Sequence, residues 1–176
     1  MNRRKSKQKE KLNIAMFGQK RIPSREGGVE IVVEELCSRM VAQGHNVTCY
    51  NRGGHHVSGS EYDSKRLKEY KGIRLKTVPT IEKKGLAAVS SSFFAALCCA
   101  FGRYDIVHIH AEGPTFFAWL PKLFGKKVIV TIHGLDLMCT QCQGHLVFYF
   151  PNIWTLSFME FQDSYNEFCR IKKFVQ

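Results

Sequence analysis

The residues best placed for chemistry early in the chain are a glycine pair and a group of cations. The segment 14–36, IAMFGQKRIPSREGGVEIVVEEL, runs from an apolar stretch through a basic loop into a helix pattern that begins at Gly27 and Gly28. A helix N-terminus offers unpaired N–H groups and partial positive charge, and glycines let a ligand approach the backbone. With the positive charges of Lys20, Arg21 and Arg25, they predict a phosphate or diphosphate site. The alternative is a tight turn that binds nothing.

Two common nucleotide motifs are missing from this sequence. Gly18 is followed by eight non-glycine residues before Gly27, so the spacing does not fit the GxGxxG motif of NAD-binding proteins. A glycine-rich loop ending in Gly-Lys-Ser or Gly-Lys-Thr occurs nowhere in the chain. The basic loop is therefore a longer loop of another kind.

Histidines stand at the ends of two later apolar segments. His108 and His110 alternate in DIVHIH, with Glu112 shortly after them, and His133 ends VIVTIH. Alternation along a strand places His108 and His110 on one face. For these two, a hydrogen-bonded core position is the favoured interpretation, and a place at the rim of a site is the alternative.

Apolar segments and helix patterns alternate along the chain. The pattern predicts strands at residues 12–17, 46–50, 73–78, 105–110 and 127–133, and helices at residues 29–43, 86–101 and 114–124. Strands separated by helices indicate an α/β fold, with a parallel sheet covered by helices on both faces. Ligands of such sheets bind beyond the carboxyl ends of the strands. We therefore expect loop 18–28, Glu112 and the three histidines on one edge.

Charge and cysteine content narrow the function classes. The net charge is +11, of which residues 1–11 contribute +5, and this leader predicts a disordered tail. A basic run without aromatic neighbours does not indicate nucleic-acid binding. The leader is followed by too short an apolar stretch for a secretion signal, so we expect a cytoplasmic protein whose seven cysteines are reduced.

One long uncharged segment raises the question of a membrane. Residues 85–102 carry no charge and are flanked by lysines and an arginine, but their serines, alanines and cysteines keep the hydropathy modest. We expect a helix packed on the sheet, with peripheral contact at the inner face of the cell membrane as the alternative.

The assembled segments resemble the amino-terminal domain of family 4 glycosyltransferases of the two-domain GT-B fold, especially rhamnosyltransferase-like enzymes of bacterial surface polysaccharide synthesis. The likeness covers residues 12–136, in the family's order: the glycine-pair segment, VTCYNRGGHHVSG, YKGIRLKTVPT, KKGLAAVSSSFFAAL, YDIVHIHAEGP and KKVIVTIHGLD. It implies a Rossmann-like parallel sheet in strand order 3-2-1-4-5. It also implies transfer of a sugar, with retention, from a nucleotide sugar to a glycan or lipid-linked acceptor, without a metal or other cofactor.

The resemblance also implies roles for individual residues. Gly27, Gly28 and Arg25 match the donor diphosphate site, and His133 matches a histidine close to the transferred sugar, which makes it the catalytic candidate. Glu26 and Glu34 have the spacing of a paired-glutamate signature, but that signature belongs to the second domain. A solvated helix face is the interpretation here.

The last forty residues depart from the family pattern. Residues 137–176 are rich in Phe and Cys, and we expect an irregular tail from a truncated or frameshifted gene, with no second nucleotide-binding domain and no activity alone. Cys139, Cys142, His145 and Cys169 offer a weaker alternative, a zinc site. The alternative function is a non-enzymatic binding module that docks on a partner or a membrane surface. Donor sugar, acceptor and oligomeric state are not readable from the sequence.

Overall fold

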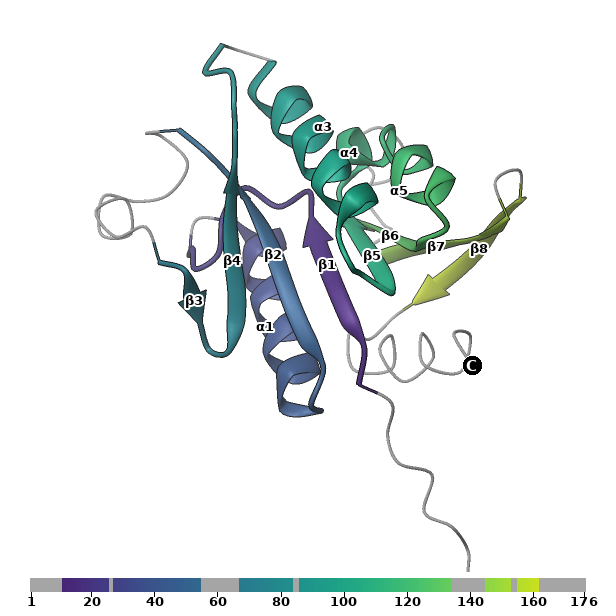
Figure 1. Ribbon diagram of the computed structural model, residues 1–176, viewed down its shortest axis with the longest axis horizontal. Coiled ribbons are helices and arrows are strands. Elements are labelled where there is room, and N and C mark those ends of the chain that lie inside the picture. Colours follow the sequence, from purple (N-terminus) through teal and green to yellow (C-terminus); the bar gives the residue numbers. More distant parts are fainter. Residues whose placement is uncertain are drawn as a thin grey trace, which may run out of the picture.

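The computed structural model describes residues 11–25, 27–54, 67–83, 86–133, 145–152 and 155–161. One twisted sheet runs through this part of the chain, in the order β3-β4-β2-β1-β5-β6-β7-β8 (Figure 1). Its strands are β1 (Asn13–Phe17), β2 (Asn46–Arg52), β3 (Glu69–Tyr70), β4 (Ile73–Val78), β5 (Ile106–His110), β6 (Lys127–His133), β7 (His145–Asn152) and β8 (Thr155–Phe161).

The five predicted strands form the parallel centre of this sheet. Each of the neighbouring pairs in β4-β2-β1-β5-β6 is parallel, which confirms the strand order 3-2-1-4-5 expected from the sequence. The short strand β3 adds an antiparallel edge beside β4. The α/β fold class is therefore as predicted.

Helices cover both faces of the sheet, as Figure 1 shows. Helix α1 (Gly28–Ala42) packs on one face, and α3 (Leu86–Phe101), α4 (Glu112–Thr115) and α5 (Trp119–Leu123) pack on the other. Strand β1 is buried on both faces, because its side chains point alternately toward the two helix layers. Ile14 and Met16 join the core under α1, and Ala15 and Phe17 join the core under α3.

Two segments differ from the predicted pattern. The helix expected at residues 114–124 is two short helices, and the turn between them is closed by bonds from Phe117 N–H to Pro114 O and from Ala118 N–H to Thr115 O. Pro121 has no N–H with which to continue an α-helical ladder back to Phe117. In the segment expected to be irregular, β7 pairs antiparallel with β6, and β8 pairs antiparallel with β7.

The loop after β1 passes very close to the end of β5. Gly18 has a φ of +111°, and a methyl group there would overlap the carbonyl oxygen of His110. Only glycine satisfies both the left-handed backbone and the missing space. Gly18 therefore sets the direction in which the chain leaves the sheet.

Replacing Gly18 with Ala tests this close approach. We expect Gly18→Ala to lower the free energy of unfolding by at least about 2 kcal/mol, because both the backbone and the His110 carbonyl must shift. Urea denaturation measures the change. The matched control is Gly113→Ala, at an ordinary φ with nothing within 4 Å of the added methyl, and it should stay within about 0.5 kcal/mol of the unsubstituted chain. Equal stability of the two variants would contradict the close approach.

Candidate ligand site at the carboxyl edge of the sheet

The loop between β1 and α1 is fastened to the end of β2. Asn51 binds both backbone groups of Ile22: its Oδ1 accepts from the Ile22 N–H at 3.1 Å, and its Nδ2 donates to the Ile22 carbonyl at 2.8 Å. The Arg52 N–H donates to the Lys20 carbonyl at 2.8 Å, which extends the ladder by one bond. The Gln19 amide donates to the Tyr50 carbonyl at 3.2 Å. The loop thus behaves as an extension of the sheet.

A carboxylate occupies part of the predicted anion site. Helix α1 begins at Gly28 with Gly27 as its N-cap, and Gly27 makes no side-chain capping bond. Glu30, in the first turn and 6% exposed, accepts the Lys20 N–H at 3.0 Å. A methyl group at Gly27 would overlap the Glu30 carboxylate. The glycine at this position therefore makes room for an internal anion, which is favourable at a helix N-terminus.

Gly28 differs from Gly27 in its surroundings. It is exposed, and a methyl group there would meet no atom of the described chain within 4 Å. Arg25 is also exposed, three residues before it in the same loop. The open part of the predicted diphosphate site is therefore the Gly28 side of the helix N-terminus.

The three candidate histidines form one stack across β5 and β6. The rings of His108 and His110 lie 4.2 Å apart between centroids, and those of His110 and His133 lie 5.3 Å apart and nearly parallel, at 21°. His110 Nδ1 and His133 Nε2 are 3.0 Å apart, so one nitrogen donates and the other accepts. His108 Nε2 shares a hydrogen bond of 2.8 Å with Thr131 Oγ1.

Burial controls the charge of this stack. His108 and His110 are each 1% exposed, whereas His133 is half-buried at the end of its strand. Burial, helped by repulsion from His133, lowers the pKa of His108 from 6.5 to about 3. His108 is therefore neutral in the folded chain at neutral pH, and it supports the ring of His110 from below.

Glu112 lies on the same edge but apart from the histidine stack. It is exposed in the first turn of α4, just after Ala111, whose φ is +81°. The Ala111 N–H donates to the Thr131 carbonyl at 3.1 Å, which holds this turn against β6. Glu112 is thus exposed to solvent just beyond the end of β5, and its place at the rim of a ligand site stays a prediction.

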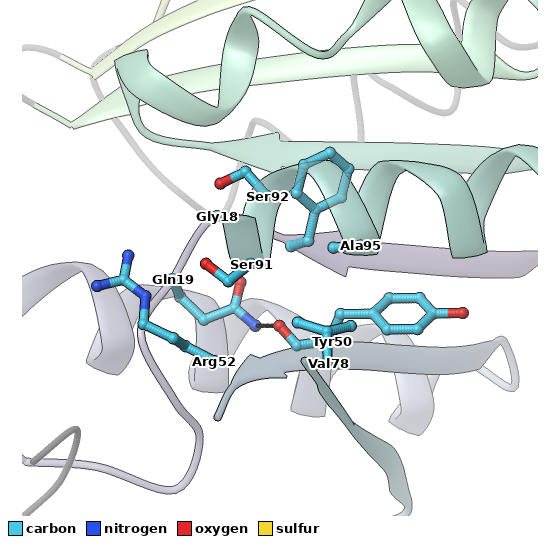
Figure 2. A pocket seen from close by; sticks show the side chains of 9 residues that line it. Gly18, Gln19, Tyr50, Arg52, Val78, Ser91, Ser92 and Ala95 are labelled. Carbon is cyan, nitrogen blue, oxygen red and sulfur yellow. Dashed lines mark hydrogen bonds between the residues drawn. The ribbon is translucent and has the colours of Figure 1, made fainter. Parts of the chain in front are cut away.

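A small polar recess opens beside the fastened loop, between β1, β2 and α3 (Figure 2). Its lining includes Gln19, Arg52, Ser91 and Ser92, and its volume of about 10 Å³ is that of a single water site. Gln19 is 3% exposed, and its Oε1 has no hydrogen-bond partner within the part of the chain that the structure describes. The Arg52 Nε has none either, and burial lowers the pKa of this guanidinium although the charge of Glu30 opposes the shift. The Gln19 Oε1 acceptor and the charged Arg52 donor could therefore both bind a polar ligand in this recess.

Several of these residues escaped sequence reasoning. The sequence pattern singled out none of Asn51, Gln19 and Glu30. A weak signal existed for Glu30, since a Glu three residues after the N-cap is the capping-box position. The pairing of Asn51 with Ile22 depends on contact across 29 residues and leaves no local pattern.

One interpretation of the sequence is wrong. Glu34 does not lie on a solvated helix face: it is 5% exposed, accepts from Lys71 Nζ at 2.8 Å, and accepts from the Tyr70 hydroxyl at 3.2 Å. Burial against the β3–β4 turn supplies these partners. Glu26 lies outside the described residues.

No metal site is present among the described residues, which hold no group of three or more His, Cys, Asp or Glu able to bind an ion. The proposed zinc ligands Cys139, Cys142 and Cys169 lie outside the residues that the structure describes. The zinc alternative for this segment therefore stays untested.

The sheet order and the helices on both faces define a Rossmann-like α/β domain. The chain matches the model of Glycosyltransferase Family 4 over residues 26–168, most of its length, and it belongs to that family. The match includes Gly27, Gly28 and the histidine stack, and it continues through β7 and β8.

Among solved structures, the chain is similar to a glycosyltransferase from Rickettsia africae ESF-5. The two are 20% identical with a TM-score of 0.49, over 75% of this chain and 32% of that one. The chain therefore spans about a third of that glycosyltransferase. No curated protein matches the chain.

The buried neutral histidine predicts a dependence of stability on pH. Because the pKa of His108 is about 3 when folded and 6.5 ordinarily, the unfolded chain binds the extra proton within this window. The free energy of unfolding contributed by His108 is complete above pH 6.5 and falls as the pH drops, by up to about 1.4 kcal/mol per unit. Urea denaturation across this range should show a shallower slope for His108→Gln. Identical slopes would contradict burial of a neutral ring.

The loop attachment predicts a large cost for one amide. Asn51→Ala leaves two buried backbone groups of Ile22 without partners, and we expect a loss of about 2–3 kcal/mol in the free energy of unfolding. The control is Asn46→Ala, which removes one exposed hydrogen bond of 2.8 Å to Asn13 Oδ1 and should cost less than about 1 kcal/mol. Thermal and urea denaturation measure both. A cost at Asn51 no larger than at Asn46 would show that the loop is not fastened there.

Proposed function

We propose that this chain supplies the acceptor-side domain of a retaining glycosyltransferase, similar to rhamnosyltransferases of surface polysaccharide synthesis. The enzyme would move a sugar from a nucleotide sugar to a glycan or lipid-linked acceptor. The single observation that carries this proposal is an open glycine, Gly28, at the first turn of α1, on the same sheet edge as the paired rings of His110 and His133. Membership of glycosyltransferase family 4 supports it.

The donor diphosphate would lie against the N-terminus of α1. The free N–H groups at Gly28 and the helix dipole stabilise negative charge that grows on the leaving nucleotide. Arg25 supplies a full positive charge from the exposed loop. Glu30 limits the approach to the Gly28 side, because its carboxylate already occupies the Gly27 side. These groups stabilise the charge without a metal.

His133 would contact the transferred sugar as the catalytic residue. Its Nε2 is held by His110 Nδ1, so the ring cannot turn without breaking that bond. His110 is itself a positioning residue, since its buried ring is supported by His108. A ring fixed in this way binds a hydroxyl in one geometry, which lowers the entropic cost of reaching the transition state.

The recess at Gln19 and Arg52 would receive a polar group of the acceptor. The Gln19 Oε1 accepts from a hydroxyl, and the Arg52 Nε donates to an oxygen. Its volume of about 10 Å³ admits one such group rather than a whole sugar ring. The reaction also needs a nucleotide-binding unit. We propose that these 176 residues alone do not catalyse sugar transfer.

We propose a cytoplasmic location for this enzyme, because its cysteines would stay reduced there and nucleotide sugars would be accessible to it. The four described cysteines that are free include Cys37 and Cys49, whose sulfur atoms lie 3.3 Å apart as thiols. Burial raises the pKa of Cys37 well above its ordinary value, so this thiol stays protonated.

Amide NMR with diphosphates tests the proposed donor site. Titration of the full chain with inorganic pyrophosphate and with UDP-, GDP- and dTDP-sugars should shift the amides of residues 27–29. Gly28→Ala should weaken this binding at least about fivefold, because the methyl fills the ligand's path to the backbone. The same variant should be more stable by about 0.4–1 kcal/mol, since alanine lowers the entropy of the unfolded chain.

Ser38→Ala is the control for this titration. It also favours the helix and lies in α1, ten residues beyond Gly28. It should bind pyrophosphate like the unsubstituted chain. Shifts absent from residues 27–29, or equal affinity of Gly28→Ala and Ser38→Ala, would contradict the donor site.

A further inference from the structure

Helix α3 presents an apolar stripe to solvent in addition to its buried face. Its inner face packs small residues on the sheet, Ala95, Ala96, Cys99 and Ala100, all buried. Its outer face carries Leu86, Val89, Phe93 and Phe101 at helical spacing, between 39% and 71% exposed. A surface helix normally turns a polar face to water. The 16 residues of α3 contain no charged side chain at all.

The stripe continues onto the two short helices beside it. Phe116, Trp119, Leu123 and Phe124 are between 45% and 75% exposed. Phe101 and Phe124 touch, with ring centroids 4.7 Å apart, and Phe93 reaches Phe116 through Phe117. We call these eight exposed side chains the α3–α5 apolar surface. Contiguous apolar surface on this scale marks an interaction site.

The charges around this surface are mostly of one sign. Residues 81–127 hold six Lys and Arg against three Asp and Glu, an excess of +3. Lys83 precedes α3, Arg103 follows it, and both are exposed. Lys126 follows α5 in the same way and is half-buried. One of the acids, Asp105, accepts a hydrogen bond of 2.7 Å from the Asn13 N–H through its Oδ2.

We propose that the α3–α5 apolar surface docks on a bilayer of anionic phospholipids. Aromatic and aliphatic side chains would enter the interface, while Lys83, Arg103 and Lys126 meet lipid phosphates. The cations that flank the uncharged helix α3 and follow α5 argue for lipid, because a bilayer offers apolar chains and negative headgroups together. None of the described helices is long and apolar enough to cross a membrane. The proposed docking on the membrane surface does not depend on the proposed reaction.

Vesicle binding of the full chain tests this surface. Vesicles of equal parts phosphatidylglycerol and phosphatidylcholine should co-sediment the chain, and pure phosphatidylcholine should bind it much less. Phe101→Ser, Leu123→Ser and Phe124→Ser together should weaken binding at least about tenfold, because three large side chains lose their transfer from water. The control Ile31→Ser alters a residue that is 44% exposed on α1, on the opposite face, and it should bind normally.

A second measurement leaves the apolar surface intact. In Trp154→Phe, Trp119 is the remaining tryptophan of the chain, and its emission should shift to the blue on anionic vesicles. Adding Arg103→Glu and Lys126→Glu should reduce that shift and its dependence on salt. Unshifted emission, or full binding by the triple serine variant, would overturn the proposal. The proposal would also be overturned if the chain formed a dimer that did not bind vesicles and that the triple serine variant dissociated. The apolar surface would then be covered by a second copy of the chain.

Discussion

The attachment of the loop after β1 to the end of β2 is the constraint on which the site depends. Asn51 closes both backbone bonds of Ile22, and Gly18 brings the loop against the carbonyl of His110. These contacts fix the first half of the loop on the sheet, and the bond from the Lys20 N–H to Glu30 ties the loop to the first turn of α1. The loop after β1, the histidine stack and the recess are thus positioned by buried hydrogen bonds between segments distant in sequence.

Two residues at the same edge limit its positive charge in the absence of a ligand. Glu30 supplies an anion to the helix N-terminus, while burial keeps His108 neutral. A diphosphate would therefore find the Gly27 side of the helix N-terminus occupied by Glu30 and the Gly28 side open. This arrangement favours a ligand whose position is fixed at Gly28 over an anion bound anywhere on the loop.

The periodic parts of the structure were readable from the sequence. Alternation and helical spacing predicted the parallel strands and α3, and the resemblance gave the strand order that the sheet confirms. Other features depend on tertiary contacts. Glu34 is buried where Lys71 and Tyr70 contact it across the fold. The split into α4 and α5 is instead local, since Pro121 offers no N–H to the Phe117 carbonyl. The alternation of His108 and His110 predicted their shared face, but the bond from His110 to His133 required the register of β5 on β6.

The most direct test of this account is amide hydrogen exchange at Ile22 and Arg52 in the unsubstituted chain. Both N–H groups close the bonds that fasten the loop to β2. We expect both N–H groups to exchange as slowly as those of Met16 and Cys49 within the parallel sheet, with the free energy of global unfolding. Exchange at the rate of an open surface loop would contradict it, because a detached loop would not hold the N-terminus of α1 at the site.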